Sequence, residues 1–354
     1  MNSNIKQIFI GIFISIIILS ISIFGGLYLS GTVEITNILS DEEEKPEIKL
    51  VNSTTDYSSI SETSLKSVAT IYSKQNDNIQ SQGSGFVYDD NYIMTNHHVI
   101  DGHQEVYIQY NDRTWETATV VGSDEHTDIA VLEPDSIPDD APPLNLMDDM
   151  PVRGNPVVAL GSPAGLTGTV TTGVISGTNR NMNTQTQFTI PDSIQTDAAL
   201  NQGNSGGPLI MTETGDVAGI NTATEGENIG FAVSARLADT IGQSIIETGD
   251  HQHSYVGIRT VELNPVVEIQ DDLDIEKGLM IEDVVEDSAN RDVLRTRETA
   301  ELPDVIVGLN GKSIETNEEL TSYLMRNTVP GDTVDLDIYR DGSIETVTIE
   351  LSSR

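Results

Sequence analysis

A serine held between glycines is the residue of this chain best suited to nucleophilic chemistry. Ser205 lies in the stretch Gly203-Asn204-Ser205-Gly206-Gly207. Glycines allow left-handed backbone conformations and a close approach of the main chain to a ligand. A serine on such a turn can present its hydroxyl beside backbone N–H groups, as an attacking alcohol and an oxyanion hole require. An ordinary glycine-rich surface turn is the competing interpretation of this stretch taken alone.

A serine hydroxyl is a weak nucleophile, so it needs a base that is itself oriented by a carboxylate. His98 follows a strand-like run, and Asp128 directly precedes an apolar one. Taken singly, a histidine beside another histidine is often a surface residue, and an aspartate before a strand is often a turn residue. Together, the order His98, Asp128, Ser205 is that of chymotrypsin-type proteases built from two β-barrels.

The stretch Gly203–Gly207 also satisfies G-x-S-x-G, the nucleophile elbow of α/β-hydrolases. That fold needs its acid and histidine after the serine, and His251 and His253 do lie downstream. An elbow, however, leads directly into a helix, whereas Leu209–Met211 reads as a strand. No alternation of strands and helices precedes the serine either. The residues therefore favour a β-barrel protease over an α/β-hydrolase.

The pattern of elements agrees with this preference. Short strand-like runs between turn signals fill residues 61 to 233, which predicts an all-β barrel or sandwich. Residues 235–248 read as an amphipathic helix ended by Gly249. From Tyr255 onward strands mix with helices expected near 289–296 and 317–327, and the turns Asn310-Gly311 and Asp341-Gly342 predict hairpins. About 100 residues fit one small second domain.

Six blocks of sequence resemble the HtrA/Deg family of serine proteases in their order and spacing. The blocks are Thr95–Val99, Thr127–Leu132, Ala159–Pro163, Ile194–Asn201, Gly203–Leu209 and Ile229–Val233. The resemblance runs from about residue 61 to the end of the chain. It implies a mainly β fold, in which a chymotrypsin-like double β-barrel at residues 61–249 is followed by a PDZ domain of α+β type at residues 250–354.

The same resemblance assigns roles within the protease domain. The family motif Thr-Asn-x-His-Val places the base at His98 and leaves His97 as its variable neighbour. It places the orienting acid at Asp128, not Asp124, and the nucleophile at Ser205. The oxyanion hole would be formed by the backbone N–H groups of Gly203 and Ser205, with Asn204 between them.

The specificity pocket can be read in part. In chymotrypsin-type proteases the base of the pocket lies six residues before the nucleophile, which is Ala199 here. An alanine offers no charge to a basic side chain, so small or medium apolar residues are expected before the cleaved bond. Asp197 is interpreted as a residue that braces the loop. The expected pocket wall is Ile220, Asn221 and Thr222.

In the second domain, Tyr255-Val256-Gly257-Ile258 resembles the carboxylate-binding loop of the family's PDZ domains. Its successive N–H groups would receive a peptide C-terminus while the peptide adds as a strand. An ordinary first strand containing a glycine is the alternative. Family PDZ domains usually read Gly-Asp-x-Ile before the Asn-Gly turn, but Leu302–Ile306 stands there after a charged insert at residues 291–301. This departure concerns the local loop and not the domain.

The N-terminal segment predicts a membrane anchor. Residues 8–29 are almost wholly apolar and uncharged, and this length can span a bilayer as a helix. The weak bias of positive charge before it places the N-terminus in the cytoplasm and the remainder outside. A cleaved signal peptide is the alternative, although no clear Ala-x-Ala site follows. We therefore expect an anchor at residues 1–30 and an acidic, flexible stalk at residues 31–60.

Composition restricts the partners and cofactors. The net charge of −38 argues against nucleic acid, because backbone phosphates would be repelled. Acid spread along the whole chain suggests a halophilic surface on which salt screens self-repulsion. Without cysteine the chain has no disulfide, thiolate nucleophile or cysteine-based metal site. We expect no cofactor and no metal, since no carboxylate spacing completes a site with His97, His98 and His103, or with His251 and His253.

The expected function is a membrane-anchored, ATP-independent serine endopeptidase that degrades unfolded or damaged extracytoplasmic proteins. Its PDZ domain would bind peptide C-termini or regulate activity, and family members form homotrimers or higher oligomers. The alternative is a latent protease that acts mainly as a PDZ-based chaperone or binding protein.

Overall fold

The computed structural model describes most of the chain after residue 55. The described residues are 56–75, 78–102, 105–162, 168–183, 189–201, 203–224, 229–266, 275–286, 288–300 and 302–353. Within these ranges, no helix is long and apolar enough to cross a membrane. The predicted anchor at residues 8–29 and most of the predicted stalk lie outside the described residues.

The described chain begins with a short helix, α2 (Tyr57–Ser64), followed by the 3-10 turn η1 (Leu65–Ser67). Asp56 caps this helix, since its carboxylate accepts a hydrogen bond of 3.1 Å from the Ser59 N–H. The helix starts four residues before the predicted start of the protease domain at residue 61. The last four residues assigned to the stalk are therefore helical, because the cap satisfies N–H groups that would otherwise face solvent unpaired.

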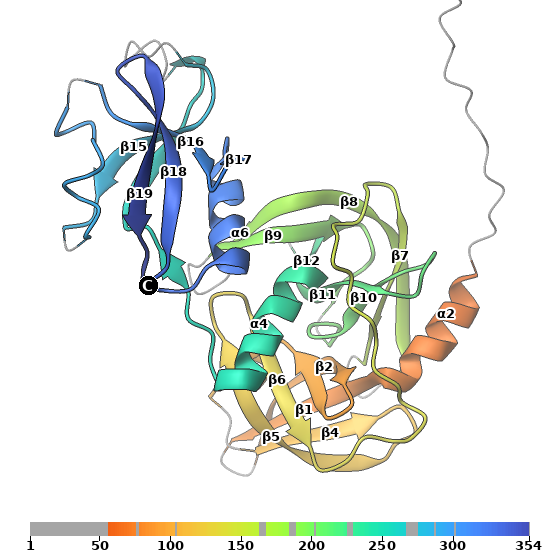
Figure 1. Cartoon of the computed structure of the whole chain (residues 1–354). Coiled ribbons are helices and arrows are strands. Elements are labelled where there is room, and N and C mark those ends of the chain that lie inside the picture. Colours follow the sequence, from red (N-terminus) through yellow and green to blue (C-terminus); the bar gives the residue numbers. More distant parts are fainter. Residues whose placement is uncertain are drawn as a thin grey trace, which may run out of the picture. The chain divides into compact units, whose positions relative to one another are not determined.

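The first half of the predicted protease domain is a closed antiparallel barrel (Figure 1). Its strands in pairing order are β1 (Val68–Gln75), β2 (Asn78–Asp89), β3 (Tyr92–Thr95), β6 (Ile129–Pro134), β5 (Trp115–Asp124) and β4 (Glu105–Tyr110). Buried and less buried residues alternate along β4, as expected for a strand with one face toward a core. A single helical turn, α3 (His97–Ile100), follows β3.

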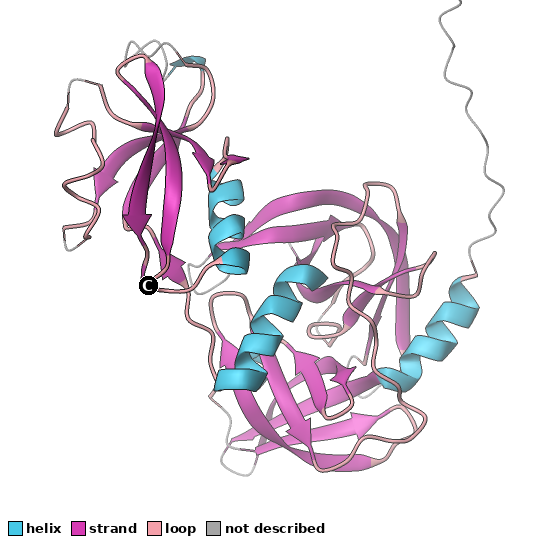
Figure 2. Ribbon diagram, in the orientation of Figure 1, coloured by secondary structure: helices cyan, strands magenta, loops and turns pink. Residues whose placement is uncertain are grey.

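The second half is another closed antiparallel barrel. Its strands in pairing order are β10 (Pro208–Met211), β11 (Val217–Thr224), β12 (Gly230–Ser234), β9 (Thr189–Thr196), β8 (Thr169–Asn183) and β7 (Pro156–Gly161). Figure 2 shows both barrels as strands joined by loops. The sequence pattern of short strands is thus confirmed as a double β-barrel, the chymotrypsin-like form of the predicted fold.

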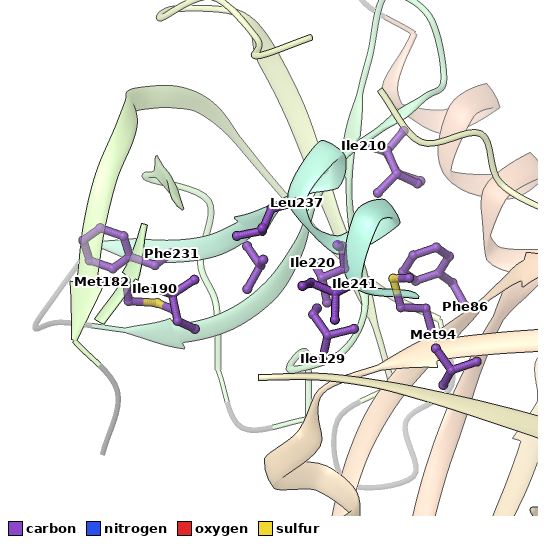
Figure 3. Close-up of a cluster of buried hydrophobic side chains, with 14 of the residues drawn as sticks. Phe86, Met94, Ile129, Met182, Ile190, Ile210, Ile220, Phe231, Leu237 and Ile241 are labelled. Atoms are coloured by element: carbon purple, nitrogen blue, oxygen red, sulfur yellow. The ribbon is translucent and has the colours of Figure 1, made fainter. Parts of the chain in front are cut away.

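The helix α4 (Ala235–Thr248) lies at the predicted residues. Ser234 caps its start by accepting a hydrogen bond from the Leu237 N–H, and Gly249 ends it with a φ of 83°. Leu237, Ile241 and Ile245 point into a hydrophobic cluster to which both barrels contribute (Figure 3). Each such side chain stabilises the fold by about 1.5–3 kcal/mol when buried. The helix α4 therefore helps to hold the two barrels together.

The predicted PDZ domain is built on an antiparallel sheet in the order β14 (Ile258–Glu262), β15 (Leu279–Val284), β16 (Val305–Leu309), β18 (Thr333–Arg340) and β19 (Ser343–Glu350). The short strand β17 (Lys312–Ser313) pairs with β16. The strands β13 (Ser254–Tyr255) and β20 (Ser352–Ser353) form a separate two-stranded sheet. Both predicted hairpin turns are present, and all four of their residues have positive φ: Asn310, Gly311, Asp341 and Gly342.

Of the two helices expected in this domain, one is present and one is not. The helix α6 (Asn317–Asn327) begins with a capping box between Thr316 and Glu319. The helix expected near 289–296 is wrong, since this segment consists of turns. Asn290 explains the difference: its side-chain amide donates to the carbonyls of Val256 and Glu350, at 3.0 Å each. These hydrogen bonds hold the segment against distant parts of the chain, so it does not form a regular helix.

The departure from the family pattern after the charged insert has a structural basis. Asp304 is completely buried, and its carboxylate accepts hydrogen bonds of 2.8 and 2.6 Å from the Arg340 guanidinium. The same carboxylate accepts a hydrogen bond of 2.8 Å from the Arg295 N–H. A paired and hydrogen-bonded buried charge of this kind fixes the loop against the sheet.

Candidate active site

His98 and Asp128 form a hydrogen-bonded pair at the mouth of the first barrel. The imidazole Nδ1 lies 2.8 Å from Asp128 Oδ2 and 3.0 Å from Oδ1, and the His98 N–H donates to Oδ1 at 3.0 Å. Asp128 has a φ of 59°, which an aspartate tolerates better than most residues. Its carbonyl accepts hydrogen bonds from the Asn96 side chain at 2.8 Å and from the His97 N–H at 3.1 Å. The backbone therefore fixes the carboxylate against one edge of the ring.

The electrostatics of this pair suit a base. Burial alone would lower the pKa of His98, but the hydrogen bond and negative charge of Asp128 outweigh burial and raise the pKa above its ordinary value of 6.5. The His98 side chain is still 49% exposed, whereas Asp128 is nearly covered. The ring edge that does not face Asp128 can therefore meet a substrate. The neighbouring His97 is held elsewhere, with its Nδ1 2.9 Å from Ser123 Oγ.

Ser205 lies on the tight turn that leads into β10. The Ser84 N–H donates to the Ser205 carbonyl at 2.8 Å, and the Gly206 N–H donates to the Asn221 carbonyl at 2.8 Å. Gly206 has a φ of 84°, and a Cβ there would lie 2.1 Å from the Ser84 carbonyl oxygen. Only glycine fits this position, so the turn is clamped between β2 of one barrel and β11 of the other.

Thr222 connects the serine to the aspartate. The Ser205 hydroxyl donates to the Thr222 carbonyl at 3.1 Å, and the Thr222 hydroxyl donates to Asp128 Oδ2. The Ser205 hydroxyl therefore points to a backbone acceptor and not to the imidazole in this structure. A rotation about χ1 of Ser205 would be needed to turn it toward His98. Catalytic hydrogen bonds in substrate-free proteases are often absent or long in this way.

The expected oxyanion hole depends on the backbone N–H groups of Gly203 and Ser205. Among the described residues, the amides of Gly203 and Ser205 donate to no protein acceptor, whereas the Asn204 N–H donates to the Asn201 carbonyl at 3.0 Å. Gly203 has a φ of 103°. Two N–H groups on one turn that have no acceptor within the described ranges could bind a developing negative charge.

Ser84 is a positioning residue that the sequence did not reveal. Its hydroxyl donates to the Gly203 carbonyl at 2.5 Å and accepts from the Ser162 N–H at 2.8 Å. Ser84 therefore connects the turn that contains Gly203 and Ser205 to β2 and to the end of β7. A serine inside a strand carries no sequence signal of this role, because the contact joins residues more than a hundred positions apart.

The residues expected to line the specificity pocket lie in different surroundings. Ala199 is exposed, and its carbonyl accepts from the Thr171 hydroxyl at 2.9 Å. Ile220 lies wholly inside the hydrophobic cluster, and Asn221 is buried with its side-chain amide donating to the Pro208 carbonyl at 3.2 Å. Of the three wall residues, Thr222 is the one whose side chain contacts the site. The expected bracing role of Asp197 is confirmed, since it accepts a hydrogen bond of 2.7 Å from the Val174 N–H.

The expected peptide-binding loop of the PDZ domain lies beside an open sheet edge. Tyr255 ends β13, Val256 is buried, and Ile258 starts β14. Gly257 between them has a φ of 79°, and a Cβ there would lie 2.9 Å from the Ser288 hydroxyl. The strand β14 is the outer strand of its sheet, so it can pair with one further strand.

Comparisons with known proteins agree with this architecture. Residues 83–220 match the family of trypsin-like peptidase domains, and residues 254–351 match the family of PDZ domains. The chain is 35% identical over 301 residues to the serine protease Do-like HtrA of Bacillus subtilis, covering 78% of this chain and 65% of the relative. It is 32% identical over 280 residues to the periplasmic pH-dependent serine endoprotease DegQ of Escherichia coli, covering 77% and 59%.

A solved structure is also similar along most of its length. The HtrA-type protease AlgW with tripeptide superimposes with a TM-score of 0.71 at 30% identity, covering 83% of this chain and 96% of that one. The chain spans 53–65% of the length of the curated relatives it matches.

Proposed function

Because the chain belongs to the HtrA family of serine proteases, we propose that it is a serine endopeptidase in which His98, Asp128 and Ser205 carry the chemistry. The observation that carries the proposal is the connected set of groups around one carboxylate. Asp128 contacts the His98 ring at 2.8 Å, and Thr222 links it to the Ser205 hydroxyl. Base and acid thus come from the first barrel, nucleophile and linking threonine come from the second, and hydrogen bonds connect all four.

The reaction follows from this arrangement. Ser205 Oγ attacks the carbonyl carbon of the peptide bond while His98 Nε2 takes its proton. The resulting imidazolium is stabilised by the Asp128 carboxylate, and the N–H groups of Gly203 and Ser205 bind the oxyanion. The imidazolium then protonates the leaving amine, which leaves an acyl group on Ser205. A water molecule, deprotonated by the same imidazole, hydrolyses this ester and restores the enzyme.

The specificity and the PDZ function belong to the same proposal. Ala199 and Thr222 favour small or medium apolar side chains before the cleaved bond, because neither offers a negative charge. Residues 255–258 and the open edge of β14 receive peptide C-termini as an added strand.

The substrates are unfolded or damaged extracytoplasmic polypeptides, and residues 8–29 anchor the chain in the membrane with both domains outside. The oligomer is a homotrimer or a larger assembly.

A second function is a latent protease that acts mainly as a chaperone or binding protein. The hydrogen bond from the Ser205 hydroxyl to the Thr222 carbonyl favours it, since a hydroxyl in this orientation cannot pass its proton to His98. Peptide binding at the PDZ domain would then be the principal activity, or the signal that turns Ser205 toward the base.

Casein cleavage by the full-length chain and by Ser205→Ala separates these functions. The endopeptidase predicts a loss of about 10⁶-fold in kcat for the variant, as for other triad serines. His97→Gln is the matched control, because His97 lies beside the base without contacting Asp128 through its ring, and it keeps its activity. Equal cleavage by Ser205→Ala and the wild type would reject the proposal. Cleavage that begins only after a PDZ-binding peptide is added would establish latency.

A further inference from the structure

Four ionisable side chains gather at a place that the proposed catalysis does not use. They are Asp124, His126, His251 and His253. Asp124 ends β5, and the two later histidines follow α4 on the segment that leads to the PDZ domain. Gly122 permits the contact between these segments, since a Cβ there would lie 2.2 Å from the Gly249 carbonyl oxygen.

Three of the four side chains are close enough to share one ion. His253 Nε2 lies 2.8 Å from Asp124 Oδ1, and His126 Nδ1 lies 3.5 Å from the same oxygen. One donor atom from each of these three residues lies within 4.8 Å of the others. The ring of His251 stands beside that of His253, with centroids 4.7 Å apart. Zinc binds such donors at about 2.0–2.2 Å, so small side-chain movements would bring them into tetrahedral coordination.

Burial makes this cluster unusual. The exposed fractions of Asp124, His253 and His251 are 4%, 6% and 8%. Within the described part of the chain, both ring nitrogens of His251 and the Nδ1 of His253 have no hydrogen-bond partner. Buried polar atoms are nearly always paired, so three unpaired nitrogens in one place point to a ligand.

The carboxylate is already held as a metal ligand needs to be. Asp124 Oδ2 accepts a hydrogen bond of 3.0 Å from the Thr127 N–H and another from the Thr127 hydroxyl. Outer contacts of this type orient ligands in metal sites.

We propose that Asp124, His126 and His253 bind a divalent transition metal of the zinc type, next to the unpaired ring of His251. Imidazole and carboxylate donors suit Zn²⁺, whereas Mg²⁺ and Ca²⁺ prefer oxygen alone. The ion takes the place of the hydrogen bond between His253 Nε2 and Asp124 Oδ1. It joins the loop that carries Asp128, four residues after Asp124, to the segment that follows α4. The site is therefore structural, and its occupation does not depend on peptidase activity.

Zinc titration of the full-length chain tests this proposal, with Ser205→Ala introduced to prevent self-cleavage. After removal of metal by a chelator, calorimetry is expected to show one tight equivalent of Zn²⁺ per chain. Substituting Co²⁺ should give the intense visible absorption of a tetrahedral site. In the same background, His126→Gln and His253→Gln should weaken binding by more than about 100-fold, which exceeds the usual cost of losing an outer contact. His97→Gln, outside the cluster, should bind as before.

His126→Gln keeps the test valid if His253→Gln fails to fold, because His126 is only partly buried and less central to the packing. Zn²⁺ should also raise the melting temperature of the parent protein and leave that of His126→Gln unchanged. Absence of a tight equivalent in the parent protein would overturn the proposal. So would several weak equivalents that persist in both histidine variants, since these would belong to the acidic surface.

Discussion

Two aspartate–histidine pairs branch from the same loop of the first barrel, four residues apart, and they have different surroundings. Asp128 and His98 meet at 2.8 Å, and Asp124 and His253 meet at 2.8 Å. The His98 side chain is 49% exposed, whereas that of His253 is 6% exposed. The two pairs thus have the same hydrogen-bond distance, but one histidine is open to solvent and the other is covered.

The difference shows that the surroundings of an aspartate–histidine pair determine whether it can take part in catalysis. The half-open His98 ring can accept a proton from a group that arrives from solvent, and Thr222 connects its carboxylate to Ser205. The His253 ring is enclosed by His126, His251 and Asp124, so no peptide can reach it. A histidine beside an aspartate is therefore suited to catalysis when one ring edge is open, and to structure or metal binding when both are covered.

The largest effect expected from this comparison is on the rate at the open pair. Asp128→Asn keeps the shape of the side chain but removes the charge that orients and stabilises the imidazolium. We expect kcat to fall by about 10⁴-fold, as when the same member of other triads is changed. Peptide hydrolysis by the purified variant measures it. A loss of less than tenfold would mean that Asp128 does not orient the base.

The buried pair should respond in stability instead. Asp124→Ala leaves His253 and the Thr127 N–H without their acceptor inside the protein. Leaving buried donors without an acceptor in this way costs about 1–3 kcal/mol in the free energy of unfolding. Urea denaturation of the metal-free protein in the Ser205→Ala background measures it. A change below about 1 kcal/mol would show that the cluster contributes nothing to folding.

The smallest effect is on the pH dependence of the open pair. The base must be neutral to take a proton, and Asp128 raises the pKa of His98 above 6.5. As the pH falls below that raised pKa, kcat/KM should fall by about tenfold per pH unit, because the charged imidazole cannot act. The rate profile of a peptide substrate measures the midpoint, with circular dichroism to verify that the fold persists. A midpoint well below 6.5 would contradict the assigned pair.

Local patterns in the sequence predicted much of this fold. The alternating strands, the helix at residues 235–248 and the Asn-Gly and Asp-Gly turns depend on nearby residues, and the structure has them. The helix expected near 289–296 failed because Asn290 is held by Val256 and Glu350, which are distant in sequence.

The candidate site shows the same limit. The stretch around Ser205 and the order of His98 and Asp128 carry a local signature. The role of Ser84 and the contact of Thr222 with Asp128 arise only when two barrels meet. The pairing of His253 with Asp124 joins residues 129 positions apart, so no spacing rule could reveal it. Such long-range contacts form through packing and leave no periodic trace in the chain.

Covalent labelling with a fluorophosphonate, followed by mass spectrometry of the peptides, tests the central claim most directly. The reagent reacts only with a serine whose hydroxyl is activated by a base beside an oxyanion hole. The account predicts one adduct per chain, on Ser205, strongly slowed in Asp128→Asn and retained at the wild-type rate in His97→Gln. Labelling of a different serine, or of Ser205 at the same rate in Asp128→Asn, would contradict it.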